Sequence, residues 1–245
     1  MMMKFFDFLR TLHRCLYIQA TWNFKGLMNL GFAQAMAPAI CRLFPDPEKR
    51  ARCLRRHLNF FLSNPYFAGY AVGACIRLEE QSAAAADPSP ERIEAFKRAI
   101  GSPLASLGDN LIWGALRPAS LLLGTALALV GSLWGPVLFL LGYNLPAVAV
   151  RAMGLKRGYA LGFNIVGEIS SPWFRRITEK LRFLAAVGLG LVAAVVINSG
   201  IEAGSVYALW ALPTLGVIVL GRFLRISYYL VLVQLLAVFI LLGYL

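Results

Sequence analysis

The sequence predicts an all-α integral membrane protein, and its composition and long apolar runs are the basis of that prediction. Of the 245 residues, 59% are hydrophobic and only 15% are charged, and the mean hydropathy is +0.66. A soluble domain usually contains about 25% charged residues. A helix that crosses the hydrocarbon core of a bilayer needs about 20 apolar residues. The chain meets that requirement several times, which argues against a soluble enzyme.

The second half, residues 119–245, contains the runs that are expected to cross the membrane. The clearest runs cover residues 120–145, 183–199 and 226–245. A fourth run, residues 207–221, is shorter and contains Pro213, so a kink is expected there. Together these runs predict about four spanning helices.

Basic residues predict the orientation of these helices. Seven arginines and lysines lie between residues 151 and 182, whereas residues 200–206 contain none. Cytoplasmic connections are enriched in Lys and Arg, so we expect residues 151–182 on the cytoplasmic side and residues 200–206 on the other side. Such clusters also account for the net charge of +12, because the chain has no separate basic domain or RNA-binding motif.

The first half, residues 1–118, follows a different pattern. Its apolar segments are short and are interrupted by charges and prolines, which indicates amphipathic or re-entrant helices. Near the start, four apolar residues follow helical spacing: Phe5, Leu9, Leu12 and Leu16. A stripe of this kind suits a helix at the membrane interface, and it is equally compatible with packing against a partner.

The sequence contains no complete catalytic or cofactor motif. His13 and His57 have no carboxylate or cysteine in a nucleophile or metal-binding pattern, and we expect His57 to be structural. The four cysteines form no C-x-x-C pair. Gly188, Gly190 and Ala193 match a dinucleotide loop only superficially, since no strand precedes them, and small-residue helix packing explains them better. We therefore expect no cofactor, no metal and no catalytic residue.

Four polar clusters in apolar surroundings are the candidate site. They are Thr21–Phe24 with Asn29–Phe32, Ser63–Tyr66, Leu78–Gln81, and Gly108–Asn110 with Trp113 and Gly114. A sugar needs amides and carboxylates for its hydroxyls and an aromatic ring for its C–H face, and these clusters supply both. Asp109 stands out because a charged residue at the centre of a membrane helix costs roughly 2.5–3.5 kcal/mol and usually lines a pathway.

Each cluster also has a purely structural interpretation. Trp22 can anchor the chain at the membrane interface, and Asn64 can cap a turn. Glu79 and Glu80 can pair with nearby arginines such as Arg77. For any single cluster, this interpretation is at least as good as a role in binding.

The order and spacing of several short motifs resemble a known family, the IID subunits of the mannose/fructose/sorbose class of the bacterial phosphoenolpyruvate-dependent sugar phosphotransferase system. The resemblance covers roughly residues 10–165. It rests on Trp22-Asn23-Phe24, Asn29-Leu30-Gly31-Phe32, Arg56-His57-Leu58, Asn64-Pro65-Tyr66, Leu78-Glu79-Glu80-Gln81, Leu107-Gly108-Asp109, Trp113-Gly114, Arg117-Pro118 and Gly154-Leu155-Lys156-Arg157-Gly158-Tyr159.

The resemblance implies a multi-pass permease subunit in the bacterial cytoplasmic membrane that carries no phosphorylated residue. It would translocate a hexose-type sugar together with a IIC subunit of inverted topology, while separate IIA and IIB proteins carry the phosphoryl group. Six residues are then expected to contact the sugar: Trp22, Asn23, Glu79, Glu80, Gln81 and Asp109.

Two positions depart from the usual family motifs. Lys25 stands where the family usually has an acid, and Asn110 follows Asp109 where the family usually has a proline. These departures leave a non-transporting regulatory or scaffold relative as the alternative. A metal-dependent membrane enzyme that uses Glu79 and Glu80 ranks last.

Overall fold

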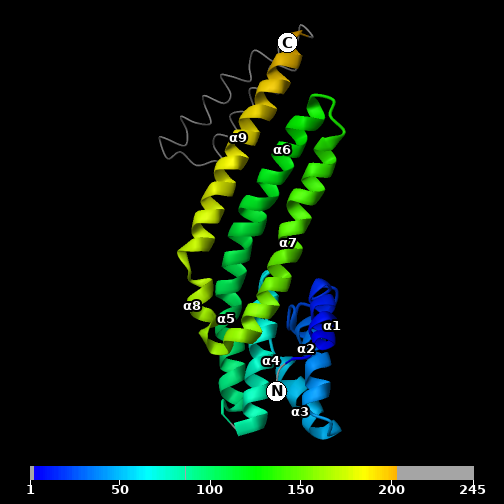
Figure 1. Cartoon of the computed structure of the whole chain (residues 1–245), viewed down its shortest axis with the longest axis vertical. Coiled ribbons are helices and arrows are strands. Elements are labelled where there is room, and N and C mark those ends of the chain that lie inside the picture. The colour runs from blue at the N-terminus through cyan, green and yellow to red at the C-terminus, as the bar shows by residue number, and fades with distance from the viewer. Residues whose placement is uncertain (1–2, 86, 203–245) are drawn as a thin grey trace.

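The computed structural model describes residues 3–85 and 87–202, and this part of the chain is helical apart from turns and two isolated β-bridges (Figure 1). The first five helices are α1 (Phe5–Leu16), α2 (Asn29–Leu43), α3 (Pro47–His57), α4 (Ala68–Ala85) and α5 (Pro90–Gly108). The following elements are the π-helix η1 (Asp109–Leu116), α6 (Arg117–Leu129), α7 (Trp134–Leu161), the 3-10 turn η2 (Gly162–Asn164), α8 (Ile165–Ile169) and α9 (Pro172–Glu202). The predicted all-α class is confirmed.

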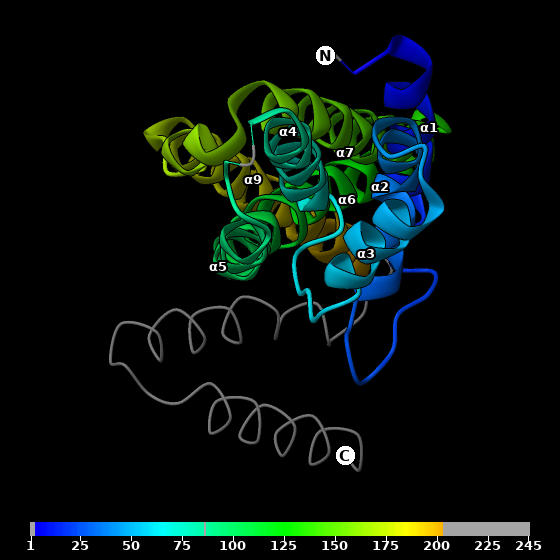
Figure 2. The ribbon, with the colours of Figure 1, turned by 90° about the horizontal axis from the view of Figure 1, so that it is seen from below.

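The helices form an elongated bundle with a body of shorter helices at one end. α6, α7 and α9 run side by side along the long axis (Figures 1 and 2). α4 and α1 pack against α7, α2 packs against α1 and α4, and α3 packs against α2. The turn between α6 and α7 lies at the far end of the bundle from α1 to α4 (Figure 1).

Three helical segments in the described residues are long and apolar enough to cross a membrane: Pro90–Leu129, Trp134–Ile169 and Pro172–Ser199. The third contains the span expected at residues 183–199, and only 6% of its most apolar window is buried. Because an apolar helix surface in water is unfavourable, these faces need lipid or another membrane subunit around them. The spans expected at residues 207–221 and 226–245 lie outside the described residues.

The prediction of one span over residues 120–145 is wrong, because this apolar run forms a helical hairpin. α6 ends at Leu129 and α7 begins at Trp134. Between them, Gly131 has φ +81°, a backbone conformation that glycine adopts without a steric penalty. The Ser132 hydroxyl accepts a hydrogen bond from the backbone N–H of Trp134 at 3.3 Å. Hydropathy does not detect this turn because apolar residues flank it on both sides.

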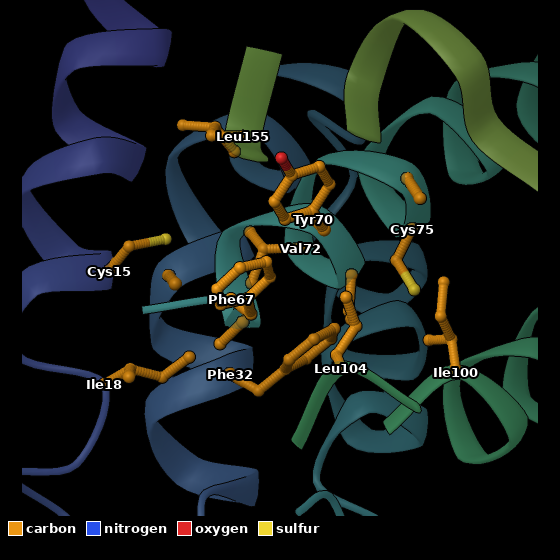
Figure 3. Packing of buried hydrophobic residues seen from close by; sticks show 14 of the residues in the cluster. Cys15, Ile18, Phe32, Phe67, Tyr70, Val72, Cys75, Ile100, Leu104 and Leu155 are labelled. Atoms are coloured by element: carbon orange, nitrogen blue, oxygen red, sulfur yellow. The ribbon is translucent and has the colours of Figure 1, made fainter. Parts of the chain in front are cut away.

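The hydrophobic core lies where α4 meets its neighbours. Side chains from α1, α2, α4, α5 and α7 converge there, among them Cys15, Phe32, Val72, Leu104 and Leu155 (Figure 3). α4 itself is buried over most of its length, from Ala68 to Ile76. This helix therefore contacts both the N-terminal body and the long bundle.

Glycines allow α4 and α7 to approach closely. A Cβ on Gly154 would lie 2.7 Å from the ring of Tyr70, and a Cβ on Gly158 would overlap the carbonyl oxygen of Tyr70. Small residues at such crossings bring helix backbones into contact, which is a common way for membrane helices to associate.

We expect Gly158→Ala to destabilise the protein by roughly 1–3 kcal/mol, because the added methyl group has no space against α4. Thermal unfolding in detergent measures this change. Gly190→Ala is the matched control, since no atom lies within 4 Å of its added Cβ. A stability for Gly158→Ala equal to that of Gly190→Ala would contradict the close packing of α4 on α7.

Candidate functional site

Two adjacent carboxylates of α4 point into the protein interior. The side chain of Glu79 is 0% exposed. Its Oε1 accepts a hydrogen bond from Arg56 Nε at 2.8 Å, and its Oε2 accepts one from Arg56 Nη2. His57 Nε2 lies 2.8 Å from the same Oε1. The last turn of α3 is thus bound to the middle of α4 by a bidentate ion pair and an imidazole.

A buried lysine of α5 completes this cluster. Lys97 Nζ donates hydrogen bonds to the carbonyl oxygens of His57 and Asn59, each at 2.8 Å. The same ammonium lies 4.7 Å from the ring centroid of Phe32, in a cation–π contact. Positive charge is favourable at a helix C-terminus, where backbone carbonyls lack helical partners. Lys97 therefore holds the end of α3 against α5.

Glu80 belongs to a second chain of polar contacts. The Tyr159 hydroxyl donates to Glu80 Oε2 at 2.5 Å, and Arg42 Nη2 lies 3.5 Å from Oε1. Arg42 also pairs with Asp7 at 2.8 Å, and Arg77 lies 3.8 Å from Glu80. This network connects α1, α2, α4 and α7. The predicted pairing of Glu80 with Arg77 is confirmed, with Arg42 and Tyr159 as further partners.

Opposing effects set the charge states in the Glu79 cluster. Burial alone would raise the pKa of Glu79, but hydrogen bonds from His57 and Arg56 outweigh burial and lower this pKa to about 2. Burial lowers the pKa of His57. Near neutral pH the pair is therefore an ionised carboxylate and a neutral imidazole whose Nε2–H donates.

The cluster includes a possible set of metal ligands. Cys53 Sγ, a ring nitrogen of His57 and a carboxylate oxygen of Glu79 lie within 4.8 Å of one another. However, Arg56 already occupies both oxygens of Glu79, and Lys97 bonds the carbonyl of His57. Burial also raises the pKa of the Cys53 thiol. Two fixed cations and a protonated thiol oppose a divalent ion, so we assign the cluster to packing and ion pairing.

The loop before α2 is organised by Asn23. Its Oδ1 accepts the backbone N–H of Gly26 at 2.8 Å, and its Nδ2 donates to Asn29 Oδ1 at 2.9 Å. Asn29 in turn donates to the carbonyl of Leu58 at 2.5 Å. The loop is thereby attached to the segment that follows α3.

Asp109 is held by a buried asparagine. Asn64 Oδ1 accepts the backbone N–H of Tyr66 at 3.0 Å, which confirms its predicted role in a turn. Its Nδ2 donates to Asp109 Oδ1 at 2.9 Å. A Cβ on Gly108 would overlap the Asn64 side chain, so the glycine before Asp109 makes room for this contact.

Asp109 begins the π-helix η1 within the continuous helical segment Pro90–Leu129, and its side chain is exposed. π-Helical turns inside longer helices are rare and are frequently found at functional sites. The next residue, Asn110, accepts a hydrogen bond from Arg182 Nη2 of α9 at 2.9 Å. A groove of about 400 Å³ lies beside this contact, lined by residues that include Ser106, Asn110 and Arg182.

Exposed aromatic rings accompany these loops. Trp22 is 45% exposed and packs edge to face against Phe24, with 4.9 Å between ring centroids. Phe24 is 93% exposed, and Phe60 and Trp113 are exposed as well. Exposed apolar residues in such numbers indicate a surface that contacts lipid, a ligand or another chain.

The six residues predicted to contact a sugar fall into different environments. Glu79 and Glu80 are buried in ion-pair networks, whereas Gln81 of α4 is exposed. Trp22 and Asn23 lie in the loop before α2, and Asp109 contacts Asn64. The segment at residues 57–64 connects these environments. Its His57 contacts Glu79, its Leu58 carbonyl accepts from Asn29, and its Asn64 donates to Asp109.

Apart from Arg77, sequence reasoning did not find the side chains that hold the Glu79 and Glu80 networks together. Arg56 belongs to a recognised motif, but the sequence did not indicate its partner. Nothing in the sequence indicated that Lys97 is buried, because a lone lysine in a mixed-charge helix usually faces water. Arg42 and Tyr159 lie far from Glu80 in sequence, so only the fold brings them together.

The fold and the site define a class: a helical membrane protein whose buried ion pairs support exposed polar loops and a π-helical segment. The chain belongs to the mannose/fructose/sorbose family of IID components of the phosphotransferase system, because the model of that family matches residues 4–241.

Curated relatives and solved structures agree with this assignment. The mannose-specific EIID component of Escherichia coli K12 is 38% identical over 173 residues, which cover 70% of this chain and 61% of that protein. The sorbose-specific EIID component of Klebsiella pneumoniae is 36% identical over 174 residues, which cover 71% of this chain and 64% of that protein. The chain thus spans less than two thirds of the length of these relatives.

A solved structure of the mannose transporter ManYZ in complex with microcin E492 matches with a TM-score of 0.63 and 35% identity, over 78% of this chain and 70% of that chain. A second structure, described as a membrane protein, matches with a TM-score of 0.70 and 36% identity over the same shares. At these identities the similarity supports both the fold and the family.

We expect Glu79→Gln to destabilise the protein by roughly 3–5 kcal/mol, because it leaves the Arg56 charge without its partner in a largely buried site. Chemical or thermal unfolding in detergent measures the loss. Glu179→Gln is the control, since the Arg175–Glu179 pair is solvent exposed at 3.6 Å, and its midpoint should stay close to that of the wild type. Equal effects of the two substitutions would contradict the role of Glu79.

Stability should fall as the pH drops below about 6.5. The folded protein keeps His57 neutral, whereas the unfolded chain takes up a proton near the ordinary histidine pKa of 6.5. The unfolded state then binds more protons, which costs at most about 1.4 kcal/mol of stability per pH unit. Unfolding between pH 7.5 and 5.5 tests this: His57→Gln should flatten the dependence, and His13→Gln, at an exposed position, should not. A wild-type slope in His57→Gln would rule the mechanism out.

Proposed function

We propose that this chain is the IID membrane subunit of a phosphotransferase-system sugar permease. Together with a IIC subunit it translocates a hexose-type sugar, and separate IIA and IIB proteins phosphorylate that sugar. The chain itself contributes no phosphorylated residue. Its place is the bacterial cytoplasmic membrane, which several of its helices cross, with residues 151–182 on the cytoplasmic side.

The observation that carries this proposal is the position of Asp109. Its carboxylate is exposed on a π-helical turn within the continuous helical segment Pro90–Leu129, which contains a stretch long and apolar enough to cross a membrane. Lipid is a poor environment for such a group, so Asp109 requires either a polar cavity or a polar partner surface. The bond from Asn64 fixes one carboxylate oxygen, which leaves the other available to a sugar hydroxyl or to a IIC side chain.

The six predicted residues then divide into two roles. Asp109, Asn23, Trp22 and Gln81 are partly or fully exposed and are the groups proposed to contact sugar where IIC meets this chain. An aromatic face and amide groups suit a hydroxyl-rich ligand. Glu79 and Glu80 act as positioning residues, because their oxygens are engaged by Arg56, His57, Arg42 and Tyr159.

The alternative, a scaffold relative that does not transport, is favoured by one contact. Asn110 bonds Arg182 and so ties η1 to α9 at the position where the family usually has a proline. A subunit that binds IIC but accumulates no sugar would fit this alternative.

Asp109→Asn should lower sugar uptake at least tenfold when the protein is produced with its cognate IIC, IIA and IIB proteins. A lost hydrogen bond to a charged group is worth roughly 1.5–3 kcal/mol, and 1.4 kcal/mol corresponds to a factor of ten. Uptake of radiolabelled mannose, fructose or sorbose measures the effect, and co-purification with IIC shows that the assembly is intact.

Asp87→Asn is the matched control, since Asp87 is an exposed aspartate outside the apolar segments. Full uptake by Asp109→Asn would remove Asp109 from the site. Wild-type protein that co-purifies with IIC but supports no uptake of any tested sugar would favour the scaffold alternative.

A further inference from the structure

The first helix has its polar face inward and part of its apolar stripe outward. Asp7, Thr11 and Cys15, spaced by one helical turn, are its buried residues. Phe5 is 68% exposed and Phe6 is 73% exposed, and Leu9 and Leu16 are exposed as well. Of the stripe recognised in the sequence, only Leu12 packs against the core, whereas Phe5, Leu9 and Leu16 face outward. On the inner face, Asp7 pairs with Arg42.

α1 lies at the edge of the body in the view from below (Figure 2). Between its first turns, the middle of α4 and the last turns of α7 there is a pocket of about 620 Å³. Phe5 and Phe8 form its apolar side, and Arg77, Lys156 and Tyr159 form its polar side. An apolar wall opposite two cations is the arrangement that an acyl chain and its anionic head group require.

The charges around the pocket are poorly compensated. Lys156 is exposed and forms no ion pair or hydrogen bond with any residue that the structure describes. Arg77 lies 5.9 Å from the ring centroid of Tyr159, and its carboxylate neighbour Glu80 is 3.8 Å away and also pairs with Arg42. Lys4, next to Phe5 in the chain, is exposed too. Net positive charge therefore remains at the rim.

We propose that this pocket binds an anionic phospholipid, with the phosphate at Lys156 and Arg77 and an acyl chain along Phe5 and Phe8. Lys156 lies in the basic segment at residues 151–182, so the lipid belongs to the leaflet on that side, where cationic residues meet lipid head groups. α1 would then lie at the membrane interface rather than against another helix. The proposal is independent of sugar transport and requires only that the chain resides in a bilayer.

Charge complementarity favours lipid over a partner subunit as the occupant. A protein partner would have to bring an acidic group to Lys156 and an apolar face to Phe5 and Phe6 together. A phospholipid contains both in one molecule, and it is present in large excess around any membrane protein. The partner subunit remains an outcome that the experiment distinguishes.

Native mass spectrometry of the purified full chain in detergent, with added phosphatidylglycerol or phosphatidylcholine, tests this proposal. We expect phosphatidylglycerol to bind at least about fivefold more tightly, and Lys156→Gln to lower that preference about fivefold, the contribution of one cation near a lipid surface. Lys49→Gln, which removes an exposed charge from α3, should leave the preference unchanged. Phe5→Ser should weaken the binding of both lipids.

Equal binding of the two lipids by the wild type, or equal effects of Lys156→Gln and Lys49→Gln, would overturn the proposal. Displacement of the lipid by inorganic phosphate at equal concentration would show that the site recognises a free anion, which also overturns it. Loss of the bound phosphatidylglycerol when the chain is purified together with a cognate IIC subunit would assign the surface to the partner. Retention of the lipid in that complex supports it. Lys156→Gln keeps the test valid if Phe5→Ser does not fold, since Lys156 is exposed.

Discussion

The buried pairing of Glu79 with Arg56 and His57 is the interaction on which the N-terminal body depends. A carboxylate with no exposed surface is tolerated only when both oxygens are occupied, and here a guanidinium and an imidazole occupy them. The same two residues end α3, whose carbonyls Lys97 holds. This ion pair thereby fixes the direction in which the chain leaves α3. The next seven residues lead to Asn64, whose side-chain amide contacts Asp109.

Charged groups consequently have two distinct tasks in this protein. Those at Glu79 and Glu80 are neutralised within the chain and stabilise the helix packing. Asp109 has an amide partner and no ion pair among the described residues. Under the proposed function this difference matters, because a sugar permease would need rigid walls as well as accessible polar groups, and the same residue types can supply both.

Much of the architecture could be predicted from the sequence because it follows from hydropathy. The all-α class and the span at residues 183–199 follow from apolar runs of sufficient length. The run at residues 120–145 forms a hairpin instead of the expected single span, because a tight turn at Gly131 changes only the backbone, which a hydropathy profile does not register. The motif containing Glu79 and Glu80 was found, together with Arg77 as a partner of Glu80. Arg42 and Tyr159 were not, because only tertiary packing brings them to Glu80. The sequence likewise did not predict that the polar face of α1 points inward. Helical spacing identifies an apolar stripe but does not show whether that stripe packs inside the protein.

The π-helical segment has a geometric consequence for the long helix that contains it. A π turn closes with a bond from residue i to i+5, so it uses about one residue more than an α turn. The segment Asp109–Leu116 therefore rotates the helix that follows it about its own axis. The side chains of α6 point in other directions around this axis than they would if α5 continued as a regular α-helix. Neighbours that contact the two halves of this long helix meet it from different directions. Removing a single residue within the segment would rotate everything beyond it by about 100°.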